Sequence, residues 1–311
     1  MSEVRPEVPC PFCSRAAPKA LRARDTNQPG ISSDEVFDYY RCGACGLWFL
    51  SPVPADLEDR YPQEYYALPA RPQFETGMDA EVYKLNLLRP HQPTGSLLEI
   101  GPACGFFAGA AKRAGYDVSV IEMNAACCRY MREEVGIQVH ESSDIVGTLR
   151  SLPKFDVIAL WHVIEHLPDP WEVLRGAADR LNDGGVLVFA TPSPDAIQFR
   201  LLRSLWTHLD APRHVFLLPM QQMVSFVRGL GLQVQEATCL DEGSLYWNKF
   251  GWEQSVRHLS TQRQRTLSRV GRLAAAIAGP FDRIEGAGAA YTIFATKGRM
   301  PPVSTIEGGT D

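Results

Sequence analysis

The chain has 311 residues, of which 45% are hydrophobic and 22% charged, a composition typical of a globular protein with a sizeable core. The formal net charge of -5 argues against a broad surface for nucleic-acid phosphates. The first residues contain no apolar signal core and no apolar run approaches a membrane span, so we expect a cytoplasmic protein built from one large domain and an appendage.

Two CxxC motifs near the start of the chain have the spacing of a metal site. Their cysteines are Cys10, Cys13, Cys42 and Cys45. Each motif can place two thiolates on one turn, and four thiolates complete the tetrahedral shell of a structural zinc ion. Residues 1–50 are therefore predicted to be a zinc ribbon, with Gly43 and Gly46 giving the second turn its freedom. Two redox dithiols or unrelated cysteines are the alternative.

The middle of the chain alternates between strand-like and helix-like segments. Residues 51–93 are predicted to be a linker that ends in a helix over roughly 79–88. From Ser96 the alternation predicts a parallel sheet with helices on both faces. The expected strands are 97–100, 117–122, 137–140, 155–160 and 186–190. The expected helices between them are 106–114, 125–134 and 170–181.

The C-terminal part extends this series with two more strands. A helix over 219–230 and strands over 232–237 and 291–296 are expected, with mainly helix over 243–286. The sheet domain is predicted to span 94–299. Within it, 195–220 and 240–288 are predicted to be substrate-binding or lid regions, and 300–311 a disordered tail.

Glycine and acidic residues mark the ends of the first three expected strands. Ligands bind beyond the carboxyl ends of strands in open α/β sheets. After the first strand, Gly101 and Gly105 would let the backbone approach a ligand. Glu122 ends the second strand, where a carboxylate can accept both ribose hydroxyls. Asp144 follows the third strand and could receive an adenine amino group.

Five motifs carry a family resemblance. They are LLEIGPACG at 97–105, VIE at 120–122, FDVIALWHVIEHLPDP at 155–170, LNDGGVLVFATP at 181–192 and PRHVFLL at 212–218. Together they resemble the class I S-adenosylmethionine-dependent methyltransferases, in the broad group of small-molecule enzymes that act on ubiquinone precursors and sugars. The resemblance implies an α/β, Rossmann-like sheet of seven strands with the last strand antiparallel. An N-terminal zinc ribbon precedes it and a helical insertion lies before the last strand.

The resemblance also implies a cofactor site. Its residues would be Glu99, Gly101, Ala103, Gly105, Glu122, Asp144, Trp161 and His162. Glu99 would approach the methionine amino group, Glu122 would hold the ribose and Asp144 would face the adenine. The family's turn usually reads GxGxG, and Ala103 stands here at its middle glycine.

Two histidines are candidates for the general base that a hydroxyl or acidic-carbon nucleophile requires. They are His214 and His162, because histidine as a residue type can take up a proton near neutral pH. The alternative for His214 is a structural role, in which its side chain packs against the following helix. His166 is expected to hold loop carbonyls rather than to act in catalysis.

Three further sets of residues were left with two interpretations each. Tyr61, Tyr65 and Tyr66 are expected to pack the ribbon on the core, and capping of the cofactor is the less favoured alternative. Tryptophans 206, 247 and 252 line an apolar substrate pocket or fill a lid core. The arginine-rich segment 257–272 is the solvated face of a packed helix or, less favoured, a basic amphipathic helix for an anionic lipid or nucleotide-linked sugar.

The sequence thus predicts a methyltransferase for a small-molecule acceptor, by O- or C-methylation of a sugar, lipid-linked glycan or natural product. A peripheral contact with a membrane or a lipid-linked substrate remains open. Two alternatives are an RNA methyltransferase with a zinc module, disfavoured by the acidic charge balance, and a non-catalytic cofactor-binding scaffold.

Overall fold

The computed structural model describes residues 7–25, 35–61, 67–257 and 264–298. The predicted disordered tail at 300–311, and Tyr65 and Tyr66, lie outside these residues. Among the described residues, no helix combines the length and apolar character needed to cross a membrane.

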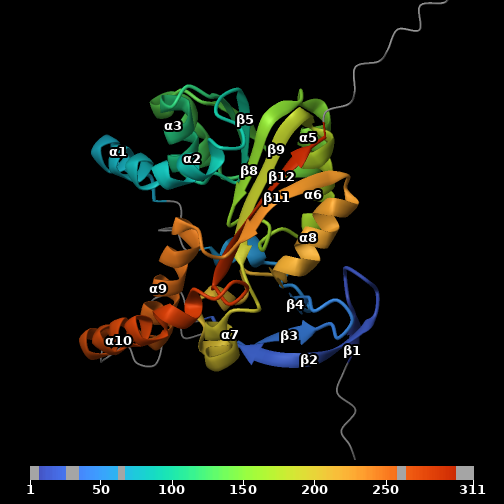
Figure 1. Cartoon of the computed structure of the whole chain (residues 1–311), viewed down its shortest axis with the longest axis vertical. Coiled ribbons are helices and arrows are strands. Elements are labelled where there is room, and N and C mark those ends of the chain that lie inside the picture. Colours follow the sequence, from blue (N-terminus) through green and yellow to red (C-terminus); the bar gives the residue numbers. More distant parts are fainter. Residues whose placement is uncertain (1–6, 26–34, 62–66, 258–263, 299–311) are drawn as a thin grey trace, which may run out of the picture.

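A seven-stranded sheet forms the centre of the molecule (Figure 1). Its strands in spatial order are β11 (Leu232–Thr238), β12 (Ala290–Lys297), β9 (Leu181–Pro192), β8 (Phe155–Trp161), β5 (Ser96–Ile100), β6 (Asp117–Glu122) and β7 (Gln138–Glu141). The strands from β9 to β7 are parallel, and β12 runs antiparallel to both of its neighbours. The predicted fold class is confirmed.

Helices cover both faces of this sheet, because successive strand side chains alternate between two apolar layers. Leu97 packs in one layer with α1 (Arg71–Ala80), α2 (Val82–Leu88) and α3 (Phe106–Arg113). Leu98 packs in the other. Helices α5 (Ile145–Ser151), α6 (Pro170–Asp179) and α8 (Met220–Gly229) lie on the opposite side of the sheet in Figure 1.

Local structure departs from the predicted elements in four places. The single helix expected near 79–88 is two helices, α1 and α2, which meet at Glu81. Helix 125–134 is α4 (Ala125–Tyr130) followed by a π-helical turn at Met131–Val135. Helix α5 was not predicted. The strand expected at 186–190 begins earlier, because β9 pairs with β8 at Leu181 and again from Val186, with a register shift between the two positions.

The N-terminal region forms a second sheet that includes a strand from the larger domain. Its order is β1 (Glu7–Pro9), β2 (Ala16–Ala23), β3 (Phe37–Arg41), β4 (Trp48–Leu50) and β10 (Phe216–Leu217). Strand β10 pairs antiparallel with β4, and the Tyr39 hydroxyl donates to the carbonyl of His214 over 2.8 Å. The PRHVFLL motif therefore joins the ribbon to the central sheet.

The expected helical insertion lies between β11 and β12. It consists of α9 (Glu242–Arg257) and α10 (Gln264–Asp282). In Figure 1 these helices and the short α7 (Ile197–Leu202) lie beyond one end of the central sheet, with α10 outermost. Short 3₁₀ turns occupy Leu57–Arg60, Arg203–Leu205 and Thr207–Leu209.

Candidate functional site

The turn after β5 is held in a left-handed backbone conformation. The φ angles of Gly101, Ala103 and Gly105 are 69°, 49° and 80°. A Cβ atom on Gly101 would lie 2.8 Å from Cγ2 of Val163, and one on Gly105 would lie 2.6 Å from Sδ of Met131. Both glycines are therefore required by backbone conformation and by packing against protein side chains, a reason that the sequence alone did not indicate.

Ala103 adopts the conformation that the family's glycine would adopt more easily. A left-handed alanine costs about 1–2 kcal/mol, and one contact helps to offset this cost. The Ala103 amide donates to Oε2 of Glu122 over 3.0 Å. The departure from GxGxG is thus accommodated by an ordinary hydrogen bond across the turn.

Glu122 holds the same region together from the end of β6. Its buried carboxylate accepts hydrogen bonds from three backbone amides, those of Ala103, Met123 and Asn124. Burial raises the pKa of this carboxyl group, against the lowering effect of these amides. A carboxylate offers about four lone pairs, so one accepting position remains for a ribose hydroxyl rather than the two that we expected.

Glu99 supplies an unpaired buried acceptor. Its Oε2 atom is buried without a hydrogen-bond partner, and burial raises the pKa of its carboxyl group to about 8. Nearby, the Lys84 ammonium lies 5.0 Å from the centre of the Trp161 ring and pairs with Glu81. An orphaned carboxyl oxygen beside the glycine turn fits a cationic ammonium group, such as that of a methionine moiety.

Asp144 has a visible structural role. It precedes α5, and its Oδ1 accepts from the Gly147 amide over 2.8 Å, which caps the helix. The side chain is exposed. Its contact with adenine stays a prediction.

His162 and Glu165 form a pair at the end of β8. His162 has a φ of 56°, a conformation that non-glycine residues adopt at a cost and often at functional sites. Its Nδ1 lies 3.5 Å from Oε1 of the fully buried Glu165, longer than a well-formed hydrogen bond. The Thr191 hydroxyl donates to the other oxygen of Glu165 over 2.9 Å.

Charge is retained on Glu165 despite its burial. Burial raises the pKa of the carboxyl group, but the neighbouring histidines, His162 first, lower the pKa below its usual value. A negative charge 3.5 Å from Nδ1 of His162 favours the tautomer that carries its proton there, which would leave Nε2 as the accepting nitrogen.

A small pocket lies beside His162. It is formed by the ends of β8, β9 and β12 together with α2 and α9. Trp247 of α9 meets the His162 ring edge-on at 4.8 Å, and Tyr83, Trp161 and Asp241 also contribute to the lining. Helix α9 therefore covers the position in front of His162.

His214 lies behind this pair and is not among the residues that line the small pocket. Its Nδ1 lies 2.8 Å from the carbonyl oxygen of His208, and its ring meets that of His166 at 4.6 Å. Each of Glu165, His166 and His214 places a nitrogen or oxygen atom within 4.8 Å of the others. Because a carbonyl can only accept, Nδ1 of His214 carries a proton in this contact.

His166 contacts a loop carbonyl, as we expected. Its Nδ1 lies 3.1 Å from the carbonyl oxygen of Arg213 and 3.0 Å from the Tyr61 hydroxyl. Burial lowers the pKa of His166 to about 4. Tyr61 thus packs at the junction between the linker and the sheet domain.

Comparison with known proteins identifies the family. A model described as a methyltransferase domain matches residues 78–237, just over half of the chain. The chain belongs to the class I S-adenosylmethionine-dependent methyltransferases.

Curated relatives of this methyltransferase include two bacterial proteins named ubiquinone biosynthesis O-methyltransferase. The protein of Paramagnetospirillum magneticum is 32% identical over 109 residues, which cover 34% of this chain and 43% of that protein. The protein of Xanthomonas axonopodis pv. citri is 25% identical over 168 residues, which cover 50% and 68%. The chain therefore spans less than half of the first relative's length.

The solved structures that resemble the methyltransferase are distant. A S-adenosylmethionine-dependent methyltransferase of Archaeoglobus fulgidus has a TM-score of 0.49 and 19% identity, and the match covers 71% of this chain and 94% of that one. A possible histamine N-methyltransferase of Thermotoga maritima has a TM-score of 0.47 and 18% identity, with 78% and 98% covered.

The four ribbon cysteines of the methyltransferase lie together. Sulfur atoms of Cys13 and Cys42 are 3.5 Å apart, and those of Cys10 and Cys13 each lie 3.7 Å from that of Cys45. The left-handed residues that follow the two CxxC motifs are Ser14 and Gly46, at φ 59° and 80°. Gly43, expected to give freedom to the second turn, is not among the residues with positive φ.

Several site residues of the methyltransferase were not singled out from the sequence. Glu165 lies in the quoted WHVIEH motif, so its carboxylate between two histidines was a visible signal. Lys84 and Thr191 carried no such signal in the sequence, because only the packing of α2 and β9 brings them to the site. Of the three variable tryptophans, Trp247 lines the pocket, whereas Trp206 and Trp252 are buried and donate to Gln198 and Asp282.

Proposed function

We propose that this methyltransferase methylates an oxygen or carbon atom of a small-molecule acceptor held between α9 and the end of β8, with His162 as general base. The paired geometry of His162 and Glu165 carries the proposal. A base must face the acceptor and be oriented from behind. His162 borders the pocket, and the Glu165 carboxylate lies on its Nδ1 side.

The cofactor site proposed for S-adenosylmethionine follows the turn after β5. Glu99, with its unpaired oxygen, would hold the methionine ammonium, and Glu122 would accept one ribose hydroxyl through its remaining lone pair. The proposed site is completed by Gly101, Ala103, Gly105, Asp144, Trp161 and His162, the last of which would border both the methionyl group and the acceptor. The bound cofactor supplies an electrophilic methyl group.

The protein's own residues would then align the acceptor and take its proton. Methyl transfer is an in-line displacement, so catalysis depends mainly on positioning at near-attack distance. Nε2 of His162 would accept the acceptor's proton, and the charged Glu165 would stabilise the resulting imidazolium. Trp247 would exclude water above the ring. His214 would support Glu165 from behind rather than meet the acceptor.

Turnover measurements on two histidine variants test this assignment. The assay follows release of S-adenosylhomocysteine with sugar, phenolic and lipid-linked acceptors. His162→Ala should lower kcat by about 100-fold or more, because general-base catalysis contributes about 10²–10⁴-fold. Because His162 also borders the proposed cofactor site, the variant's affinity for the cofactor should fall as well, but by much less than kcat. His214→Ala should retain more activity than His162→Ala. Full turnover by His162→Ala would remove it from the mechanism.

We also propose that the four ribbon cysteines bind one structural zinc ion. A tetrahedral site with zinc–sulfur bonds of about 2.3 Å places its sulfurs about 3.8 Å apart, close to the observed 3.5–3.7 Å. Four thiolates leave no open position for water, so the role would be structural. Elemental analysis should find one zinc per chain, lost in Cys10→Ser/Cys42→Ser and kept in Cys239→Ser. Full occupancy in the double variant would refute the site.

A further inference from the structure

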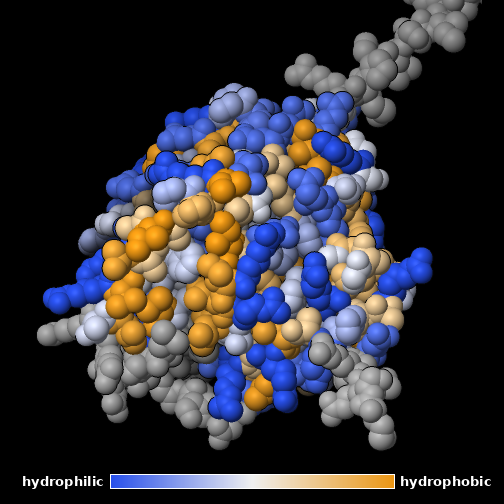
Figure 2. Space-filling view, turned by 60° about the horizontal axis from the view of Figure 1, so that its bottom comes forward, coloured by the Kyte–Doolittle hydropathy of each residue, from blue (hydrophilic) through white to orange (hydrophobic). Residues whose placement is uncertain are grey.

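Helix α10 presents an apolar stripe on its outer face. Val270, Leu273, Ile277, Phe281 and the following Ile284 are between 47% and 64% exposed. They recur every three or four residues, so they share one side of the helix. The opposite side packs on α9, where Gly271 lies so close that a Cβ atom would meet Cα of Glu253 at 2.8 Å. Figure 2 shows bands of hydrophobic surface on the side of the molecule where α10 lies in Figure 1.

Three arginines lie beside this stripe, and one exposed carboxylate, that of Glu285, follows Ile284. Arg269, Arg272 and Arg283 are exposed, and the only acidic residue among the described side chains of α10, Asp282, is buried. Among the described residues, no carboxylate forms an ion pair with these arginines. The chain as a whole carries a net charge of -5. A cationic flank on an acidic protein is therefore a local feature of α10.

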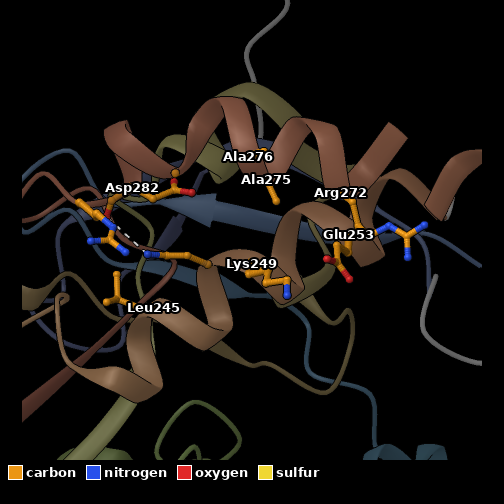
Figure 3. Close-up of a pocket in the computed structure, with 10 residues that line it drawn as sticks. Leu245, Lys249, Glu253, Arg272, Ala275, Ala276 and Asp282 are labelled. Atoms are coloured by element: carbon orange, nitrogen blue, oxygen red, sulfur yellow. Dashed lines mark hydrogen bonds between the residues drawn. The ribbon is translucent and has the colours of Figure 1, made fainter. Parts of the chain in front are cut away.

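A cavity of about 350 Å³ lies between α9 and α10, next to this flank. Figure 3 shows its labelled side chains coming from both helices, with Lys249 and Glu253 on α9 and Arg272 on α10. Ala275, Ala276 and Gly279 form an apolar wall. The Oδ1 atom of Asp282, which is 2% exposed, has no hydrogen-bond partner. Oε1 of Glu253 is likewise buried without a partner. The cavity thus offers the cations Lys249, Arg272 and Arg283 together with two carboxylate acceptors.

We propose that the α9–α10 hairpin docks on an anionic phospholipid surface. The apolar stripe would enter the acyl boundary, as amphipathic interfacial helices do. The arginines and Lys249 would meet lipid phosphates, and Asp282 would accept from a headgroup hydroxyl. This arrangement matches a glycerol headgroup, which carries both a phosphate and hydroxyl donors. The sequence leaves segment 257–272 with two interpretations, of which residues 258–263 lie outside the described part of the chain, and the exposed stripe on α10 supports the lipid-binding one.

A second copy of the chain fits this face less well. The five stripe side chains expose on the order of 500 Å², below the roughly 800 Å² per partner of a stable interface. A two-fold contact would also bring the arginine flanks of both copies together without an exposed carboxylate on α10 to offset them. An anionic bilayer supplies the opposite charge and an apolar layer together.

Vesicle co-sedimentation tests the proposal. Full-length protein is mixed with phosphatidylcholine vesicles, or with vesicles that also contain phosphatidylglycerol, at low and high salt. The wild type should partition at least tenfold more strongly to the anionic vesicles, and salt should weaken binding. Ile277→Glu should lose at least tenfold in partitioning. Val53→Glu, which adds the same charge at an exposed apolar residue of the linker after the ribbon, should bind as the wild type does.

Other outcomes would overturn the docking surface. Equal binding to neutral and anionic vesicles, or no binding, would do so, as would undiminished binding by Ile277→Glu. A wild-type dimer that becomes monomeric in Ile277→Glu and ignores vesicles would assign the face to self-association. Calorimetric titration with S-adenosylmethionine, without vesicles, keeps this test separate from the proposed catalytic function.

Discussion

The added methyl group of Gly101→Ala would test the turn after β5 in two ways. Gly101 has a φ of 69°, and a Cβ atom there would lie 2.8 Å from Cγ2 of Val163. The left-handed conformation costs about 1–2 kcal/mol for alanine, and overpacking typically adds about 1–3 kcal/mol. We therefore expect a loss of about 2–5 kcal/mol in the free energy of unfolding, with at least tenfold weaker binding of S-adenosylmethionine.

Gly115→Ala is the matched control for this variant. Gly115 also has a positive φ, 96°, but a Cβ atom there would meet nothing within 4 Å. Its alanine variant should show only the backbone cost, with unchanged cofactor affinity. A second control, Gly101→Ala/Val163→Ala, removes the clash and should recover part of the loss.

Urea denaturation and calorimetric titration with S-adenosylmethionine measure the two quantities. If Gly101→Ala were no more destabilised than Gly115→Ala and bound the cofactor as tightly as the wild type, the turn would have neither the packing nor the cofactor role assigned to it. If Val163→Ala failed to relieve the loss, the predicted clash would be wrong.

Three further predictions concern the stability of the site and its junction with the ribbon. Arg213→Leu should lower the free energy of unfolding by about 3–5 kcal/mol, because this 3% exposed arginine pairs with Asp25 of the ribbon domain and with Asp210. The control Arg22→Gln, at an exposed pair, should cost no more than about 1 kcal/mol. Equal losses of the two variants in urea denaturation would contradict the argument. Burial holds the pKa of His166 at about 4, below the unfolded value of about 6.5, so the unfolded chain takes up the proton first as the pH drops and the free energy of unfolding falls. His166→Asn should remove about 2 kcal/mol of this fall between about pH 7.5 and about pH 5. The same dependence of stability on pH in the variant and the wild type would refute this. Ala103→Gly should change the free energy of unfolding by less than about 1 kcal/mol, because relief of the left-handed strain is offset by a more flexible unfolded chain. Tighter binding of S-adenosylmethionine by this variant in titration would show that the Ala103 methyl group crowds the cofactor.

The sequence by itself determined the features that depend on local pattern. The alternation of apolar strands and helices predicted a parallel sheet with helices on both faces, and the CxxC spacing predicted the cysteine cluster. The joining of seven strands in one sheet and the antiparallel direction of the last one came from the family resemblance. The sequence also marked Gly101 and Gly105 as special positions, but their left-handed conformation and their packing against Val163 and Met131 emerged only from the structure.

Contacts between distant segments were decided only by the tertiary structure. Pairing of β10 with β4 places His214 at the ribbon junction, whereas His162 at the end of β8 faces α9. The sequence could not rank the two histidines because their side chains carry the same chemistry and only the fold decides which of them faces the pocket. Likewise, the spacing of the basic residues in 257–272 would be the same whether the apolar side of the helix is buried against the protein or exposed. Only the packing of α10 on α9 shows which face remains exposed.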